Sequence, residues 1–285
     1  MCTVVLSIVP DLPLLLAGVR DELTDRPWEP PGRHWPQYPG LLGGRDLQAG
    51  GTWLAISPAE LRVACVLNGI GRPAPPQTRR SRGVLPLLAA AGRSLDRGML
   101  ADLDPFHLVV AEPGGAVLQS WDGLDFAEQT MPFGLHLVVN SGVASYLPGT
   151  DSASADLTSV VTGGRGESAA PPPDGREHEV ARMRHFLGRF GSAGRPDPRP
   201  GQSVAAAWGD WFSLVNGDAI EPSDQRALIV RRDLADGKTW GTTSISLVAL
   251  ATAQVRYDFC GQPGNQAAWY SVTLTPSTSR RQAPP

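Results

Sequence analysis

The sequence predicts an α+β protein with two β-sheets and helices packed outside them. Short β-branched runs come first, helical patterns occupy the middle, and a closing run of antiparallel strands follows. This order argues against a doubly wound parallel sheet, in which strands and helices alternate. The 285 residues include 32 glycines and 27 prolines, which favours many short strands joined by tight turns.

The chain opens with a predicted β-hairpin. Thr3–Val9 and Pro13–Val19 are apolar runs of strand length, and a proline and an aspartate between them supply a turn. Pairing across that turn sets Cys2 opposite Val19. Cys2 is therefore expected at the beginning of a strand.

The later elements follow from the same patterns. Residues 26–51 resemble a loop and end in a glycine-dense stretch. Further strands are expected at Thr52–Ser57, Leu61–Leu67, Phe106–Ala111, Val117–Trp121, Leu135–Asn140, Arg226–Arg231, Trp240–Leu250, Gln254–Phe259 and Trp269–Thr273. Helices are expected at Val84–Leu103, Glu177–Phe190 and Ser203–Val215.

One domain is expected to span residues 1–275. Residues 148–175 are rich in Ser, Ala, Gly, Thr and Pro, and this composition predicts a mobile loop within that domain. The last residues, 276–285, are expected to be a disordered tail.

Charge and cysteine content narrow the class of protein. A net charge of -3 gives no broad attraction for nucleic acid. The apolar stretch Leu12–Val19 is too short to span a bilayer, and no basic region precedes it, so neither a secretion signal nor a membrane span is expected. Three widely separated cysteines form neither a disulfide framework nor a CxxC or zinc motif. We expect a cytoplasmic protein with no metal and no cofactor.

Cys2 is the candidate nucleophile. Initiator methionine is normally removed before a small second residue, which would leave a thiol and a free α-amine on Cys2. An α-amine with a pKa of roughly 7.7–8 can accept the thiol proton in place of a histidine. Arg20 beside Cys2 would lower the thiol pKa, and Asp21 would orient the α-ammonium. The alternative is that Cys2 has no catalytic role and only begins an edge strand, with Arg20 and Asp21 as an ordinary surface ion pair.

Three blocks of sequence carry a family resemblance. In order they are Met1-Cys2-Thr3, then Leu16-Ala17-Gly18-Val19-Arg20-Asp21-Glu22 with Arg26-Pro27, and Gly43-Gly44-Arg45-Asp46 leading to Gly50-Gly51-Thr52-Trp53-Leu54. Weaker blocks are Ser81-Arg82-Gly83, Asn140-Ser141 and Trp240-Gly241-Thr242. The chain thus resembles the NRDE proteins, also called transport and Golgi organisation protein 2-like, most clearly over its first 85 residues.

The resemblance implies a four-layer αββα sandwich of two antiparallel sheets flanked by helices, as in N-terminal nucleophile hydrolases. The family is similar at its start to Cys-dependent bile-salt and penicillin V amidases. By that resemblance Cys2 is the nucleophile and Arg20 and Asp21 are its neighbours. Asn68 and Asn140 match positions where such amidases hold an oxyanion or the N-terminal amine. Each asparagine also suits a turn, Asn68 with Gly69 in a type I′ turn.

Two positions depart from the family pattern. Val19 stands where the family has its eponymous asparagine, and Thr243 stands where an arginine commonly follows the aromatic-Gly-Thr block. The resemblance therefore implies the fold more strongly than the activity.

Two functions remain open. The first is hydrolysis of amide C–N bonds in a small molecule, with Cys2 as nucleophile. The alternative is a non-catalytic carrier or chaperone for haem or another hydrophobic ligand, since eukaryotic relatives have been linked to haem trafficking. His178 and His185, seven residues apart, would share one helix face and could ligate a haem iron. No CxxCH motif is present, so a solvated helix face is the simpler explanation.

Overall fold

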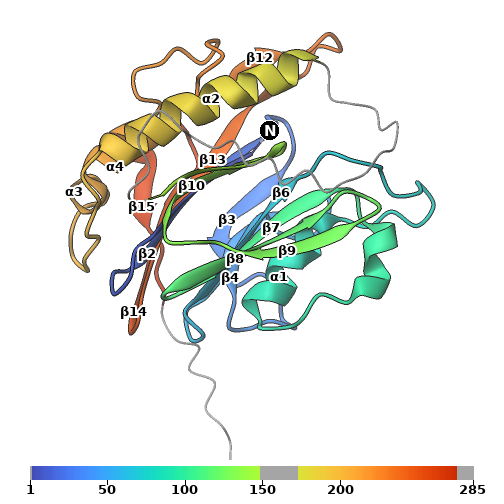
Figure 1. Ribbon diagram of the computed structural model, residues 1–285, viewed down its shortest axis with the longest axis horizontal. Helices are drawn as coiled ribbons and strands as arrows, with labels where there is room; N and C mark the ends of the chain where they lie inside the picture. The colour runs from blue at the N-terminus through green and yellow to red at the C-terminus, as the bar shows by residue number, and fades with distance from the viewer. Residues whose placement is uncertain (1, 148–172, 275–285) are drawn as a thin grey trace, which may run out of the picture.

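Two antiparallel β-sheets make up most of the computed structural model, which describes residues 2–147 and 173–274 (Figure 1). The predicted α+β class with two antiparallel sheets is confirmed. The predicted mobile loop lies outside the described residues except for its last three, which begin helix α2 (Pro173–Ser192). The predicted tail lies outside them entirely.

The first sheet is built around the N-terminal hairpin. Its strand order is β11-β10-β1-β2-β13-β14-β15, and β12 pairs with β13. The bounds are β1 Thr3–Ile8, β2 Leu14–Leu23, β10 Gly134–Val139, β11 Gly142–Tyr146, β12 Arg231–Asp233, β13 Thr239–Ala251, β14 Gln254–Cys260 and β15 Trp269–Ser271.

The second sheet follows chain order from β3 to β9. Its strands are β3 Trp28–Gly32, β4 Leu42–Asp46, β5 Leu54–Ser57, β6 Arg62–Asn68, β7 Phe106–Glu112, β8 Gly115–Trp121 and β9 Phe126–Thr130. Every pairing in this sheet joins strands that are neighbours in sequence, and the one long connection, between β6 and β7, carries the helix α1 (Leu85–Ala90).

The two sheets pack face to face. In β1 and β2, Leu6 and Leu16 face the second sheet, whereas Val5 and Ala17 face a layer of helices. Both faces of these strands are buried, which explains why the hairpin is apolar throughout rather than alternating.

Helices cover both outer faces. Against the first sheet lie α2, α3 (Val204–Trp208) and α4 (Asp210–Val215), and against the second lies the short α1 (Leu85–Ala90) (Figure 1). The predicted helix over residues 84–103 is wrong beyond its first turns, because Gly92 adopts φ +71° and ends it. A 3₁₀ helix, η2 (Arg97–Asp102), follows instead.

The register of the opening hairpin differs from the prediction by one residue. Thr3, not Cys2, pairs with Val19, so continuing the register sets Cys2 level with Arg20. Pro13 has no N–H to donate and stays outside the ladder, which begins at Leu15 opposite Ser7. A shift by one residue exchanges the two faces of a strand, and it therefore decides which side chains meet Cys2.

The predicted loop over residues 26–51 is wrong, because it contains β3 and β4. Gly43 and Gly44 are strand residues at positions with no room for a side chain. A Cβ on Gly43 would lie 2.4 Å from the carbonyl oxygen of Leu54, and one on Gly44 would lie 2.3 Å from the Trp53 ring. The predicted strand at 226–231 is also wrong, since β12 begins only at Arg231.

Candidate functional site

Cys2 lies directly before β1, at the edge of the core between the two sheets, and is half-buried. Its backbone nitrogen donates to Oδ1 of Asn140 over 3.3 Å. Asn140 directly follows β10, whose Val139 pairs with Thr3, so strand pairing brings the two residues together across 138 positions. The Cys2 Sγ lies 3.9 Å from the backbone oxygen of Asp21.

Arg20 projects from β2 into the space between the sheets. Its Nη1 donates to Oγ1 of Thr243 over 2.8 Å, and its guanidinium carbon lies 4.5 Å from the centre of the Trp53 ring. Thr243 sits at an irregularity in β13, where the register with β2 shifts. Such bulges re-aim side chains. Position 243 therefore does reach the site, although it carries a hydroxyl where the family commonly has arginine.

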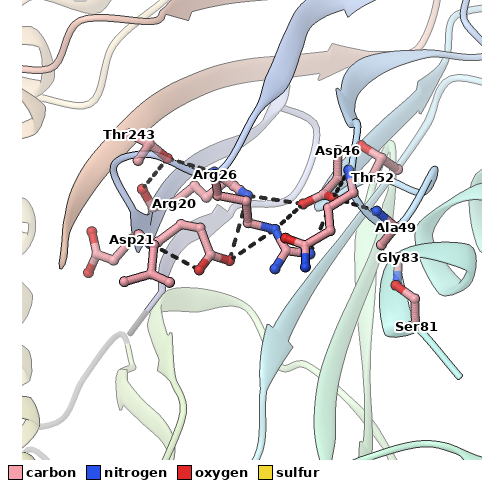
Figure 2. A network of polar contacts seen from close by, with 12 residues as sticks. Arg20, Asp21, Arg26, Asp46, Ala49, Thr52, Ser81, Gly83 and Thr243 are labelled. Atoms are coloured by element: carbon pink, nitrogen blue, oxygen red, sulfur yellow. Dashed lines mark hydrogen bonds and ion pairs between the residues drawn. The ribbon is translucent and has the colours of Figure 1, made fainter. Parts of the chain in front are cut away.

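Two arginines and two carboxylates form a cluster, the quartet, whose Arg20 acts electrostatically on Cys2. Figure 2 shows its members Arg20, Arg26 and Asp46. Asp46 lies 3.3 Å from Nη2 of Arg20 and 2.6 Å from Nε of Arg26. Glu22 lies 3.6 Å and 3.8 Å from the same two side chains. Its two positive and two negative charges balance within the cluster.

Asp46 is the hub of the quartet. Burial alone would raise the pKa of Asp46, but hydrogen bonds from Arg26 and from the backbone of Ala49, with the two guanidinium charges, hold it below its ordinary value. Asp46 therefore stays ionised and fixes both arginines. Asp46 was not predicted as a site residue, although it ends the Gly43-Gly44-Arg45-Asp46 block that carries the family resemblance.

Asp21 points to the opposite side of β2 from Arg20. Its carboxylate accepts from Oγ1 of Thr242 over 2.7 Å and from Nη1 of Arg182 over 3.4 Å. Arg182, on α2, is almost fully buried and also donates to Oγ1 of Thr3. Asp21 thus meets Cys2 through its backbone oxygen, while its carboxylate ties the helix layer to the hairpin.

The segment that carries Asn140 is fixed from two sides. The backbone nitrogen of Ser141 donates to Glu179 Oε2 over 3.0 Å, and Nε2 of His107 lies 3.2 Å from the carbonyl oxygen of Asn140. Burial raises the pKa of Glu179 and lowers that of His107. Helix α2 and strand β7 therefore position Asn140, and no local sequence signal marks either residue for this role.

Asn68 ends β6 and is exposed. Within the described residues, no hydrogen bond joins its side chain to Cys2 or Asn140. Neither Asn68 nor Gly69 adopts a positive φ, so the alternative prediction of a type I′ turn is wrong. The backbone nitrogen of Gly69 instead donates to Pro105, which continues the β6–β7 edge.

The three cysteines are free thiols in different settings. Burial raises the pKa of the Cys2 thiol, the charge of Asp21 adds to this, and the amino terminus and Arg20 act against it. Burial likewise raises the pKa of Cys65 and of Cys260, both of which are enclosed. The net direction at Cys2 is upward, opposite to the depression expected from its arginine alone.

The two histidines considered for haem are engaged elsewhere. His185 Nε2 lies 3.2 Å from Asp218, and His178 Nδ1 lies 3.0 Å from Arg232. Neither contact favours an iron site. In the described part of the chain, no group of three or more His, Cys, Asp or Glu side chains is placed to hold a metal ion. No helix there has the length and hydropathy needed to cross a membrane.

Comparison with known proteins identifies the family. A search of curated proteins gives no significant match. The family model described as Transport and Golgi organisation 2 matches residues 1–184, well over half of the chain. The matched span holds Cys2, the quartet, Asn140 and the two α2 residues that fix the site, Glu179 and Arg182. The chain therefore belongs to the Transport and Golgi organisation 2 family, as the three N-terminal sequence blocks predicted.

Proposed function

We propose that this protein hydrolyses amide C–N bonds in a small molecule, with Cys2 as an N-terminal nucleophile. The observation that carries the proposal is the contact between the Cys2 backbone nitrogen and Oδ1 of Asn140. Once Met1 is removed, that nitrogen becomes the α-amine, held beside the thiol of the same residue. The order of layers, helices on both outer faces of two packed sheets, supports an N-terminal nucleophile hydrolase fold.

The surroundings of Cys2 suit this chemistry. Asn140 accepts one amine hydrogen, which directs the nitrogen lone pair for proton transfer from the thiol. Burial disfavours a free thiolate, so the thiol loses its proton to the α-amine only as sulfur attacks a bound substrate. Arg20, locked by Asp46 and Thr243, supplies a fixed positive charge that lowers the energy of the thiolate.

The reaction balances without any cofactor. The α-amine takes the thiol proton as sulfur attacks the amide carbonyl carbon, and the amine then returns that proton to the leaving nitrogen. A thioester on Cys2 and a free amine result. Water, deprotonated by the same α-amine, then cleaves the thioester and regenerates the thiol.

Two measurements test the proposal. Intact mass should show loss of Met1, and an amide substrate panel should give turnover that Cys2→Ala abolishes and Cys260→Ala preserves. Cys260 is the matched control because it is a free, buried thiol far along the chain in β14. A mature protein that retains Met1, or turnover that survives Cys2→Ala, would overturn the proposal. A haem titration beside the panel detects the alternative carrier function.

A further inference from the structure

Arg82 is an arginine near Cys2 that makes no direct ion pair with a carboxylate of the described residues. The quartet neutralises Arg20 and Arg26 with Glu22 and Asp46. On the other face of β2, Asp21 is matched by Arg182. Asp104, which directly precedes the Pro105 that Arg82 contacts, is paired with Arg79 at 3.1 Å. Within residues 2–147 and 173–274, no carboxylate lies within ion-pair distance of Arg82.

The backbone around Arg82 is firmly placed. Arg82 begins the 3₁₀ turn η1 (Arg82–Val84), which Ser81 caps by accepting from the nitrogen of Gly83. The carbonyl of Gly83 accepts from Thr52 over 2.9 Å, and a Cβ added to Gly51 would lie 2.5 Å from the Gly83 backbone (Figure 2). The turn is thus packed against the strand that leads to Trp53.

The guanidinium of Arg82 reaches the end of β6. Its Nη1 donates to the carbonyl oxygen of Pro105 over 2.7 Å, and the same oxygen accepts from Gly69 over 2.8 Å. Asn68, the neighbour of Gly69, therefore lies beside Arg82 at this edge. Arg82 is half-buried, so its remaining donors are only partly hydrated.

Arg82 lies on the same side of the molecule as the nucleophile. Pro105, its acceptor, directly precedes β7, whose His107 lies 3.2 Å from the carbonyl oxygen of Asn140, and Asn140 in turn accepts from the Cys2 nitrogen. Burial lowers the pKa of Arg82, and the negative charges of Asp104, of a Cys2 thiolate and of Glu22 act against that lowering. A guanidinium stays charged even so. Holding such a charge partly out of water without an anion is costly, and a bound carboxylate would remove that cost through a two-point hydrogen bond.

We propose that Arg82 is a specificity residue that binds a carboxylate of the substrate, so that the preferred substrates are amides carrying a carboxylate near the scissile bond. This deepens the proposed function and rests on it. One edge of the guanidinium is held by Pro105, and the other is presented to the ligand. Asn68 lies at the same edge, which gives that exposed asparagine a place at the ligand rather than at the amine of Cys2.

Protection of Cys2 from alkylation tests the proposal without relying on turnover. The probes are N-acetylglycine and its carboxamide, which differ only in charge, and the readout is the peptide-resolved rate of Cys2 modification by iodoacetamide. In the unsubstituted protein, half-maximal protection should need at least tenfold less of the carboxylate than of the carboxamide. Added salt should weaken this preference. Equal protection by both probes would overturn the proposal.

Variants then locate the effect. Arg82→Gln should abolish the preference for carboxylate. Arg82→Lys should keep part of it, because lysine retains the positive charge but cannot make the two parallel hydrogen bonds of a guanidinium. Arg80→Gln is the matched control, since Arg80 lies in the same loop, is mostly exposed and pairs with Asp102. A preference that survives Arg82→Gln in folded protein contradicts the assignment.

The turnover arm separates this proposal from the one on which it rests. With an active enzyme, Arg82→Gln should raise KM for a carboxylate-bearing amide by roughly 10- to 100-fold and leave KM for its neutral analogue unchanged. If no amide is hydrolysed while the carboxylate still protects Cys2, the hydrolase proposal fails and the carboxylate site stands.

Discussion

Two arginine–aspartate contacts in this molecule, one buried and one partly buried, have the same chemistry and different surroundings. In the first sheet, Arg256 and Asp258 lie on β14, with Nε 2.6 Å from Oδ2. In the quartet, Arg26 Nε lies 2.6 Å from Asp46 Oδ2. The two contacts are equally short. The first holds helix α3 against the sheet, and the second belongs to the quartet near the Cys2 thiol.

The difference lies in what saturates each group. Asp258 also accepts from the Trp208 indole and from Ser271, and Arg256 donates further to the carbonyls of Arg199 and Gln202. This cluster, the β14 clamp, joins α3 and the segment before it to the sheet edge. Near Cys2, by contrast, the quartet leaves the thiol half-buried, and Arg82 is held only by a backbone carbonyl, that of Pro105. An arginine–aspartate pair therefore points to a candidate functional site only where a reactive group, here the Cys2 thiol, lies next to it.

The largest expected effect is at the β14 clamp. Asp258→Ala would leave Arg256 and the Trp208 N–H buried without their acceptor, which should lower the free energy of unfolding by about 3–5 kcal/mol. The melting temperature should fall by on the order of 10 °C. The exposed Asp197→Ala is the control and should melt with the unsubstituted protein. A change in the alkylation rate of Cys2 in folded Asp258→Ala would erase the contrast between the two clusters.

Asn140 should show the reverse pattern. Asn140→Ala removes the acceptor for the Cys2 amine and should lower turnover by roughly 10- to 1000-fold, the range for loss of one site hydrogen bond, with little change in melting temperature. Turnover of a scissile amide and thermal unfolding are measured on the same preparation. If stability falls while turnover per folded molecule persists, Asn140 is a structural residue and leaves the site.

The thiols give a third contrast. Cys2 should react with iodoacetamide faster than Cys65 or Cys260. Burial raises the pKa of all three thiols, but Cys2 is only half-buried and lies near the positive charge of Arg20, whereas the other two are enclosed. Arg20 lowers the pKa of Cys2, so Arg20→Ala should raise it and slow alkylation, by about tenfold for each unit of change.

Peptide-resolved rates from pH 5 to 9 separate access from ionisation. Arg20→Lys is the control variant, since it keeps the charge beside Cys2 while losing the fork that binds Thr243 and Asp46. Equal rates for Cys2 and Cys260 would mean that no distinctive nucleophile exists.

The smallest effect concerns acid stability. The pKa of Asp46 is lower folded than unfolded, so its contribution to stability is present above about pH 4 and is lost as the pH falls through the folded value. Asp46→Asn should therefore be less stable at neutral pH, and the gap should narrow below pH 4. Urea unfolding between pH 7 and 3 measures the slopes, which should differ by at most one proton. Parallel slopes would show that the quartet does not hold Asp46 ionised.

Local patterns were enough to predict much of the sheet structure. The apolar runs at Thr3–Val9 and Leu61–Leu67 predicted strands because β-branched and apolar residues fit a packed sheet. Glycine misled the prediction at β4, since Gly43 and Gly44 permit close packing there rather than a turn. The helix at Val84–Leu103 was predicted too long, because its apolar pattern was given more weight than Gly92, whose positive φ ends α1.

The site was only partly accessible to sequence reasoning. The order Cys2, Arg20, Asp21 identified the correct end of the hairpin, but the one-residue register change decided that Arg20 faces the second sheet and Asp21 faces α2. Glu179 and Arg182 could not be foreseen from local patterns. They reach the hairpin and its neighbouring turn from a helix that is distant in sequence, and a helical pattern alone does not specify what its polar residues meet.

The anchoring of Thr3 sets an order of events during synthesis. Thr3 is fully buried, paired with Val139 and Val19, and bonded to Arg182 from a helix made more than 160 residues later. A peptidase that trims Met1 needs the first residues extended in its own cleft, which this docked strand does not allow. Removal of Met1, which the proposed function requires, is therefore expected on the nascent chain, before the hairpin folds. Slowed trimming would leave a fraction of molecules that are folded, permanently capped and inert.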